Sequence, residues 1–82
     1  MFRMTKQERI DLAITRAAKL QGEADAAMVE ANYYEKQIAS CDPHVDWWRF
    51  AHLKQKRADA QREYNQVAGH AAAAAEYVES LL

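Results

Sequence analysis

A single proline divides this chain into two runs of similar length that both favour helix. Pro43 has no backbone N–H to donate, and it disfavours the helical backbone conformation at Asp42. A first helix should therefore end near Ser40. Asp42 can be the N-cap of a second helix with Pro43 at its first position, so the chain reverses direction here. We predict one domain over residues 1–82, with a helix over about 6–40, a turn over about 41–43 and a second helix over about 44–80.

Both runs consist largely of residues that favour helix. The chain has seventeen alanines, two glycines and one proline, which leaves little material for loops or strands. Alanine favours helix strongly but buries little apolar area, so two helices of this composition pack around a thin core. We therefore expect an all-α protein whose monomer has modest stability.

Charge and cysteine content narrow the classes of function. A net charge of −1 argues against general binding to nucleic acid or to acidic membranes. The chain has no apolar stretch of the ~18 residues that a membrane span needs, and its first residues lack the apolar core of a secretory signal. Cys41 is the only cysteine, so no internal disulfide can form. These features predict a cytoplasmic protein without a cofactor.

Heptad patterns run through both predicted helices. Thr5 and Glu8 have the spacing of a capping box, in which each residue satisfies a backbone N–H of the other at a helix start. Beyond it, apolar residues recur at steps of three and four, as in a coiled coil. In the first helix this seam comprises Ile10, Ala13, Ala17, Leu20, Ala24, Ala27, Ala31, Tyr34 and Ile38. The seam of the second helix comprises Phe50, Leu53, Arg57, Ala60, Tyr64, Val67, Ala71, Ala74, Val78 and Leu81.

The two seams and the charges predict an antiparallel coiled-coil hairpin. Reversal at the turn brings Ala24 opposite Ala60, where the helices can approach closely. Acidic side chains in the middle of the first helix then lie beside basic ones at the start of the second, which opposes a parallel arrangement. Arg57 is the one polar seam residue. We expect it to pair with Glu23 or Glu30, or else to extend its charged head into solvent.

Apolar residues remain on one side of the hairpin after the seams are paired. Two helices cannot cover such a strip, and small scaffolds commonly solve this by oligomerising. We expect a homodimer that forms a four-helix bundle, and a different protein on the same strip is the alternative. The residues of this predicted dimer face are Ile14, Met28, Ala68, Ala75 and Leu82.

A second candidate surface lies at the turn end, where two tryptophans follow each other. Consecutive helical residues point about 100° apart, so Trp47 and Trp48 cannot both join the seam. We predict that at least one of them, Trp48, faces solvent or a protein partner, with Arg49 and Tyr33 near the same end. Exposed tryptophan, tyrosine and arginine are enriched among the residues that dominate binding energy at interfaces. The alternative is that Trp47 is buried in the dimer and Trp48 lies flat along the helix.

The sequence predicts neither a catalytic site nor a metal site. Cys41 and His44 have a spacing that zinc ligands can have, but His52 points about 80° away from His44 around the helix. That angle spoils the convergence that a structural zinc site needs. A nucleophilic cysteine needs a base within a cleft, which a two-helix rod does not offer. We therefore expect no enzyme activity.

The start of the first helix also carries a resemblance to a known family. It reads Met4-Thr5-Lys6-Gln7-Glu8-Arg9, followed by Leu12, Arg16 and Gln21. This stretch resembles the start of the Rop family, plasmid RNA-binding helical hairpins that dimerise into four-helix bundles. The resemblance covers residues 4–21 and implies that architecture together with RNA binding. Ala17 stands where a phenylalanine of that family contacts RNA, and the turn and second helix do not correspond.

These observations favour a small non-enzymatic protein-binding module. We expect it to self-associate and to dock on a larger protein as an adaptor or inhibitor. Phages and mobile elements encode accessory factors of this size and shape, and the expectation rests on that analogy. The alternatives are a Rop-like RNA-binding hairpin and a structural assembly subunit.

Overall fold

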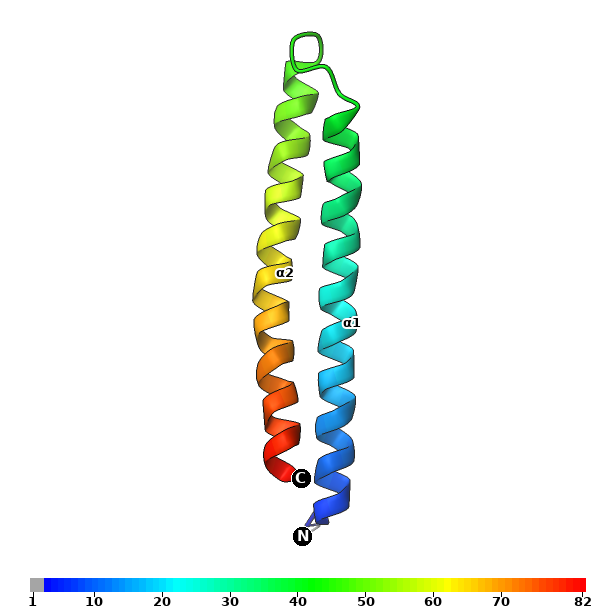
Figure 1. The fold of residues 1–82 in the computed structure, drawn as a ribbon, viewed down its shortest axis with the longest axis vertical. Helices are drawn as coiled ribbons and strands as arrows, with labels where there is room; N and C mark the ends of the chain where they lie inside the picture. The colour runs from blue at the N-terminus through cyan, green and yellow to red at the C-terminus, as the bar shows by residue number, and fades with distance from the viewer. Residues whose placement is uncertain (1–2) are drawn as a thin grey trace.

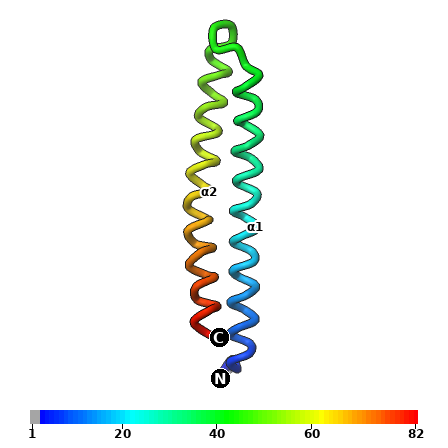
Figure 2. Tube along the Cα trace, in the orientation of Figure 1, coloured from blue at the N-terminus to red at the C-terminus, as the bar shows by residue number. Residues whose placement is uncertain are grey.

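The computed structural model describes residues 3–82 and contains two long helices joined by a turn. Helix α1 spans Lys6–Ala39 and helix α2 spans Trp47–Leu81. They pack side by side as an antiparallel hairpin whose longest dimension is 64 Å (Figure 1). The start of α1 and the end of α2 lie together at one end, the open end, and the turn forms the opposite end (Figure 2). The predicted all-α hairpin is confirmed.

The start of α1 is fixed by one half of the predicted capping box, since the Glu8 carboxylate contacts the Thr5 hydroxyl and not the Thr5 backbone N–H. Thr5 is the N-cap, and its Oγ1 accepts a hydrogen bond from the Glu8 backbone N–H at an N···O distance of 3.1 Å. The Thr5 hydroxyl also donates to the Glu8 carboxylate at 3.2 Å. A carboxylate in the first turn is further stabilised by the positive end of the helix dipole. These contacts start the helix at Lys6.

Replacing Thr5 by alanine is expected to lower the free energy of unfolding by about 1 kcal/mol, because one N–H group of the first turn loses its acceptor. Thr5→Ser keeps a hydroxyl at the same position and is the matched control. Denaturant unfolding followed by circular dichroism gives both values. An alanine variant as stable as the parent would show that the first turn of α1 frays and contributes nothing.

The two predicted seams make the contact between the helices. The larger seam residues, such as Leu20, Tyr34 and Phe50, are only half-buried. Among the described residues, no large side chain is fully buried. The core is therefore thin, as the alanine-rich composition predicts. The buried residues all belong to the seams, and they are Leu53 and six alanines: Ala13, Ala24, Ala27, Ala31, Ala60 and Ala71.

The hairpin exposes more surface than a compact protein of its mass. Its accessible area is 6469 Å². A compact monomer of 9.4 kDa exposes about 5,000 Å². The excess exceeds the area of about 800 Å² that each partner of a standard protein–protein interface removes from water. The fold is thus open enough for association to bury a substantial area.

The turn is longer than predicted, and α2 begins later, at Trp47. The Asp42 Oδ1 accepts a hydrogen bond from the His44 backbone N–H at 2.9 Å. The Asp42 carbonyl accepts from the N–H groups of Val45 and Asp46, at 3.3 and 2.9 Å. These bonds close a separate turn between the two helices.

The predicted start of the second helix is therefore wrong. Asp42 caps a lone turn, and Pro43 lies within that turn instead of at the first position of α2. Asp46 takes the N-cap position of α2, but its side chain accepts no hydrogen bond from the first turn of the helix. The first helix ends as expected, with Ser40 as its C-cap.

Arg57, the polar seam residue, pairs with a different carboxylate from those predicted. Its Nε forms an ion pair with Glu35, and not with Glu23 or Glu30. Helical side chains lean toward the N-terminus of their own helix, so Arg57 leans toward the turn end and Glu35 toward the open end. The two therefore meet, whereas Glu23 leans away from Arg57. Both partners are about half exposed, so the pair contributes no more than about 1 kcal/mol.

Candidate binding surfaces

The turn end presents three exposed aromatic side chains. Trp47 and Trp48 are 68% and 63% exposed, because α2 begins at Trp47 and no earlier helical turn covers them. Tyr33, in the last two turns of α1, is 57% exposed, and its ring meets that of Tyr34 edge-on at 5.4 Å between centroids. In the hairpin both tryptophans, and not Trp48 alone, are open to solvent.

The predicted binding residues at this end do not share one face. The Arg49 guanidinium donates to Gln37 Oε1 at 3.4 Å, which places Arg49 beside α1. Tyr33 precedes Gln37 by four residues, so it lies on the same side of α1. Trp47 precedes Arg49 by two residues and points about 200° away from it, toward the opposite side, with Trp48 between them. Together these residues form a surface, the turn-end cluster, that wraps around the end of the rod.

The predicted dimer face forms an apolar strip along one side of the hairpin. Met28 precedes Glu35 by one heptad, so the strip lies on the side of the ion pair between Glu35 and Arg57. Met28 and Ala68 are half-buried by the hairpin itself. The strip is most open toward the open end, where Ile14 is 48% exposed, Leu82 is 81% exposed and Ala75 is exposed.

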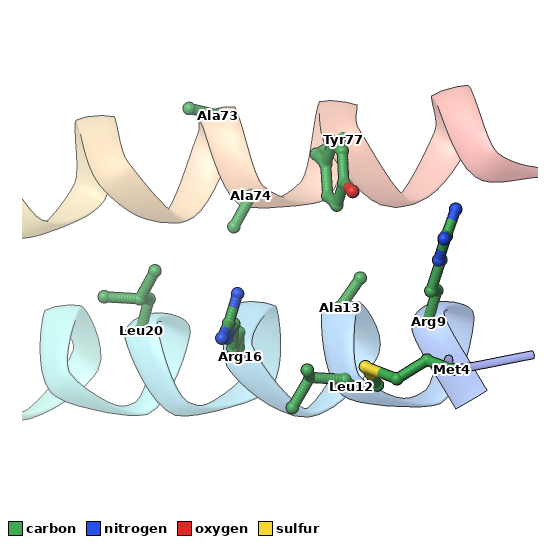
Figure 3. A pocket seen from close by; sticks show the side chains of 9 residues that line it. All are labelled: Met4, Arg9, Leu12, Ala13, Arg16, Leu20, Ala73, Ala74 and Tyr77. Atoms are coloured by element: carbon green, nitrogen blue, oxygen red, sulfur yellow. The ribbon is translucent and has the colours of Figure 1, made fainter. Parts of the chain in front are cut away.

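A groove between the helices occupies the open end (Figure 3). It lies on the side that also carries Arg49, because Tyr77, in its lining, follows Arg49 by four heptads. Its volume is about 620 Å³. It forms because Ala73 and Ala74 are too small to fill the space beside Ala13 and Leu20. Sequence reasoning missed this groove, since the alanine run fits the heptad pattern without further explanation. The residues that line it are Met4, Arg9, Leu12, Ala13, Arg16, Leu20, Ala73, Ala74 and Tyr77.

The groove combines apolar walls with positive charge. Met4, Leu12 and Tyr77 are 42%, 38% and 55% exposed. Arg9 and Arg16 stand two helical turns apart on α1 and both extend toward α2, as Figure 3 shows. This arrangement suits a partner surface on which carboxylates lie on either side of an apolar residue.

The turn holds the one cysteine. Cys41 is partly buried, and its Sγ lies 3.9 Å from the Asp46 carbonyl oxygen. Within residues 3–82, no three side chains of histidine, cysteine, aspartate or glutamate are grouped so that they could hold a metal ion. Over the same residues, neither helix has a stretch that is both long and apolar enough to cross a membrane.

Comparison with known proteins does not identify a family. Neither protein-family models, nor curated proteins, nor solved structures match this chain.

Proposed function

We propose that this chain is a non-enzymatic protein-binding module that docks on a larger protein through its turn-end cluster. The observation that carries the proposal is the exposure of two adjacent tryptophans, Trp47 and Trp48. Large apolar side chains gathered on a surface mark interaction sites. Tryptophan and arginine are the residues that most often dominate interface energies.

The way the hairpin holds this surface supports such a role. The hydrogen bonds of Asp42 order the turn, and Phe50 is half-buried with the Lys54 ammonium 5.5 Å from its ring centroid. A surface that is ordered before binding loses little conformational entropy when the partner arrives. We therefore propose an adaptor or inhibitor of a larger assembly, of the phage or mobile-element accessory type. A cytoplasmic location fits the single cysteine, Cys41.

Capture from an extract of the native host tests the proposal. The parent and two variants, Trp48→Ala and Tyr77→Ala, are immobilised, and the retained proteins are identified. Tyr77 is the matched control, since it is an exposed aromatic residue at the open end. A protein retained by the parent and by Tyr77→Ala but lost from Trp48→Ala supports docking at the turn end. Equal retention by all three would contradict it.

Self-association through the apolar strip is the second part of the proposal. The excess exposed area of the hairpin supports it, and two copies joined in this way would form a four-helix bundle. Light scattering at micromolar concentration is expected to give at least the mass of a dimer. Ile14→Glu, in the strip, should lower the measured mass, whereas Val29→Glu, at a position that is 70% exposed on the outer face of α1, should not. A parent that stays at the monomer mass would overturn this part.

Each of the two alternative functions has a separate test. Retention on RNA that weakens steeply with salt would support the RNA-binding role that the Rop resemblance implies. Growth beyond a dimer as concentration rises, with no protein retained in the capture experiment, would support a structural assembly subunit. Neither result is expected for a module that acts through its turn end alone.

A further inference from the structure

We infer that α1 also pairs with α1 of a second copy, in antiparallel orientation, along the side of the hairpin that carries the groove. The inference rests on a charge row, which we define as Arg9, Arg16, Glu23 and Glu30, each seven residues from the next. Arg9 and Arg16 line the groove, and Gln37, the next residue at this spacing, contacts α2. The row therefore follows one side of the hairpin.

The charge row is complementary to itself when one copy is turned end to end. In that orientation Arg9 lies opposite Glu30 of the second copy, and Arg16 lies opposite Glu23 of the second copy. A twofold axis repeats both contacts, because the same patch is used by each copy. The two arginines and the two glutamates share a spacing of about 10 Å, so the four ion pairs fit one register. In a parallel arrangement like charges would face each other.

These charges are available because the hairpin does not use them internally. All four side chains of the charge row are exposed. The ion pairs among residues 3–82 join Arg57 to Glu35 and Arg62 to Asp59, and neither pair includes a residue of the row. The sequence predicts complementary charges along the two helices, but within the described chain only Arg57 and Glu35 form an ion pair between them. The charge row is therefore available to an external partner.

The groove and the residues beside it supply an apolar contact between the charges. Leu12 lies between Arg9 and Arg16 along α1 and is 38% exposed. Antiparallel pairing brings it near Ala26 of the second copy, an exposed residue small enough to let the two helices approach. Lys19 lies near the twofold axis, and its long stem lets its ammonium group reach solvent.

This contact is distinct from the proposed dimer and from the turn-end cluster. The charge row and the apolar strip lie on opposite sides of the hairpin, since the strip lies on the side of Glu35 and the row on the side of Gln37. One copy can therefore use both sides at once. Two different self-contacts per copy lead to assemblies larger than a dimer.

Charge reversal of each half of the row tests the inference. One variant carries Arg9→Glu with Arg16→Glu, and the other carries Glu23→Arg with Glu30→Arg, both in an Ile14→Glu background that disables the apolar strip. Each variant alone places like charges opposite each other and should weaken self-association by roughly tenfold or more. An equimolar mixture of the two should associate as the background protein does. Sedimentation velocity over a dilution series measures the background protein, the two variants and the mixture. High salt should weaken the association of the background protein and of the mixture, but not that of either variant alone.

A control variant changes the charge on a different side of α1. Asp11→Arg with Asp25→Arg changes the charge of α1 by the same amount on another side of the helix, and it should leave self-association within about threefold of the background. Circular-dichroism melts confirm that every variant is folded. A background protein that stays monomeric, or a mixture that fails to associate, would overturn the inference. Neither result bears on docking through Trp48.

Discussion

Replacing Ala24 by leucine is expected to lower the free energy of unfolding by about 1–3 kcal/mol. Ala24 is 0% exposed, and Ala60, on the facing seam of α2, is 4% exposed. The added carbon atoms have no space between the helices, so they would force the seams apart and loosen the neighbouring contacts. Thermal melts give a clear reading, because 1 kcal/mol shifts the Tm of a domain of this size by about 4–8 °C.

Ala58→Leu is the matched control for this prediction. Ala58 lies two residues before Ala60 on α2, and its side chain is exposed. The same enlargement there should change the free energy of unfolding by no more than about 0.5 kcal/mol. If Ala24→Leu has the same Tm as the parent and the control variant, the alanine seam is not the closely packed contact of this fold.

Trp48→Ala is expected to cost at least ~2 kcal/mol of partner binding, which is about a 30-fold loss of affinity. The fold should survive, because Trp48 is 63% exposed and its removal leaves no internal cavity. Trp47→Ala should behave differently. Trp47 precedes Ala68 by three heptads, so it shares the side of the apolar strip, and its loss should also weaken the dimer.

Two measurements on each tryptophan variant separate these effects. Calorimetry against the captured protein gives the affinity, and circular-dichroism melts give the stability. If Trp48→Ala binds that protein as tightly as the parent does, the binding surface lies elsewhere. The alanine-lined apolar strip would then be the next surface to change.

The hairpin and its seams could be predicted because they depend on local signals. Pro43 breaks the helix wherever the rest of the chain lies, and the heptad steps identify the buried face without any knowledge of the partner helix. The start of α2 could not be predicted in the same way. Asp42 offers the same capping bonds to a continuing helix and to a lone turn. In the folded chain the lone turn connects two packed helices, and their packing is a property of the whole fold.

The candidate surfaces could be predicted only in part, for a similar reason. The exposure of Trp48 follows from the angle between consecutive helical residues. The groove does not, because the space beside Ala73 and Ala74 depends on which side chains α1 places opposite them. The pairing of Arg57 with Glu35 depends on the direction in which each side chain leans across the helix boundary. Such features need both helices in place.

The common position of the two helix ends has a consequence for how this chain can be joined to something else. A domain or label attached at either terminus is held at the open end, and the tryptophans lie at the other end of a rod 64 Å long (Figure 1). Each helix is continuous over its whole length, Lys6–Ala39 for α1 and Trp47–Leu81 for α2. A domain tethered at the open end is therefore kept at a nearly constant distance from the protein that Trp47 and Trp48 contact.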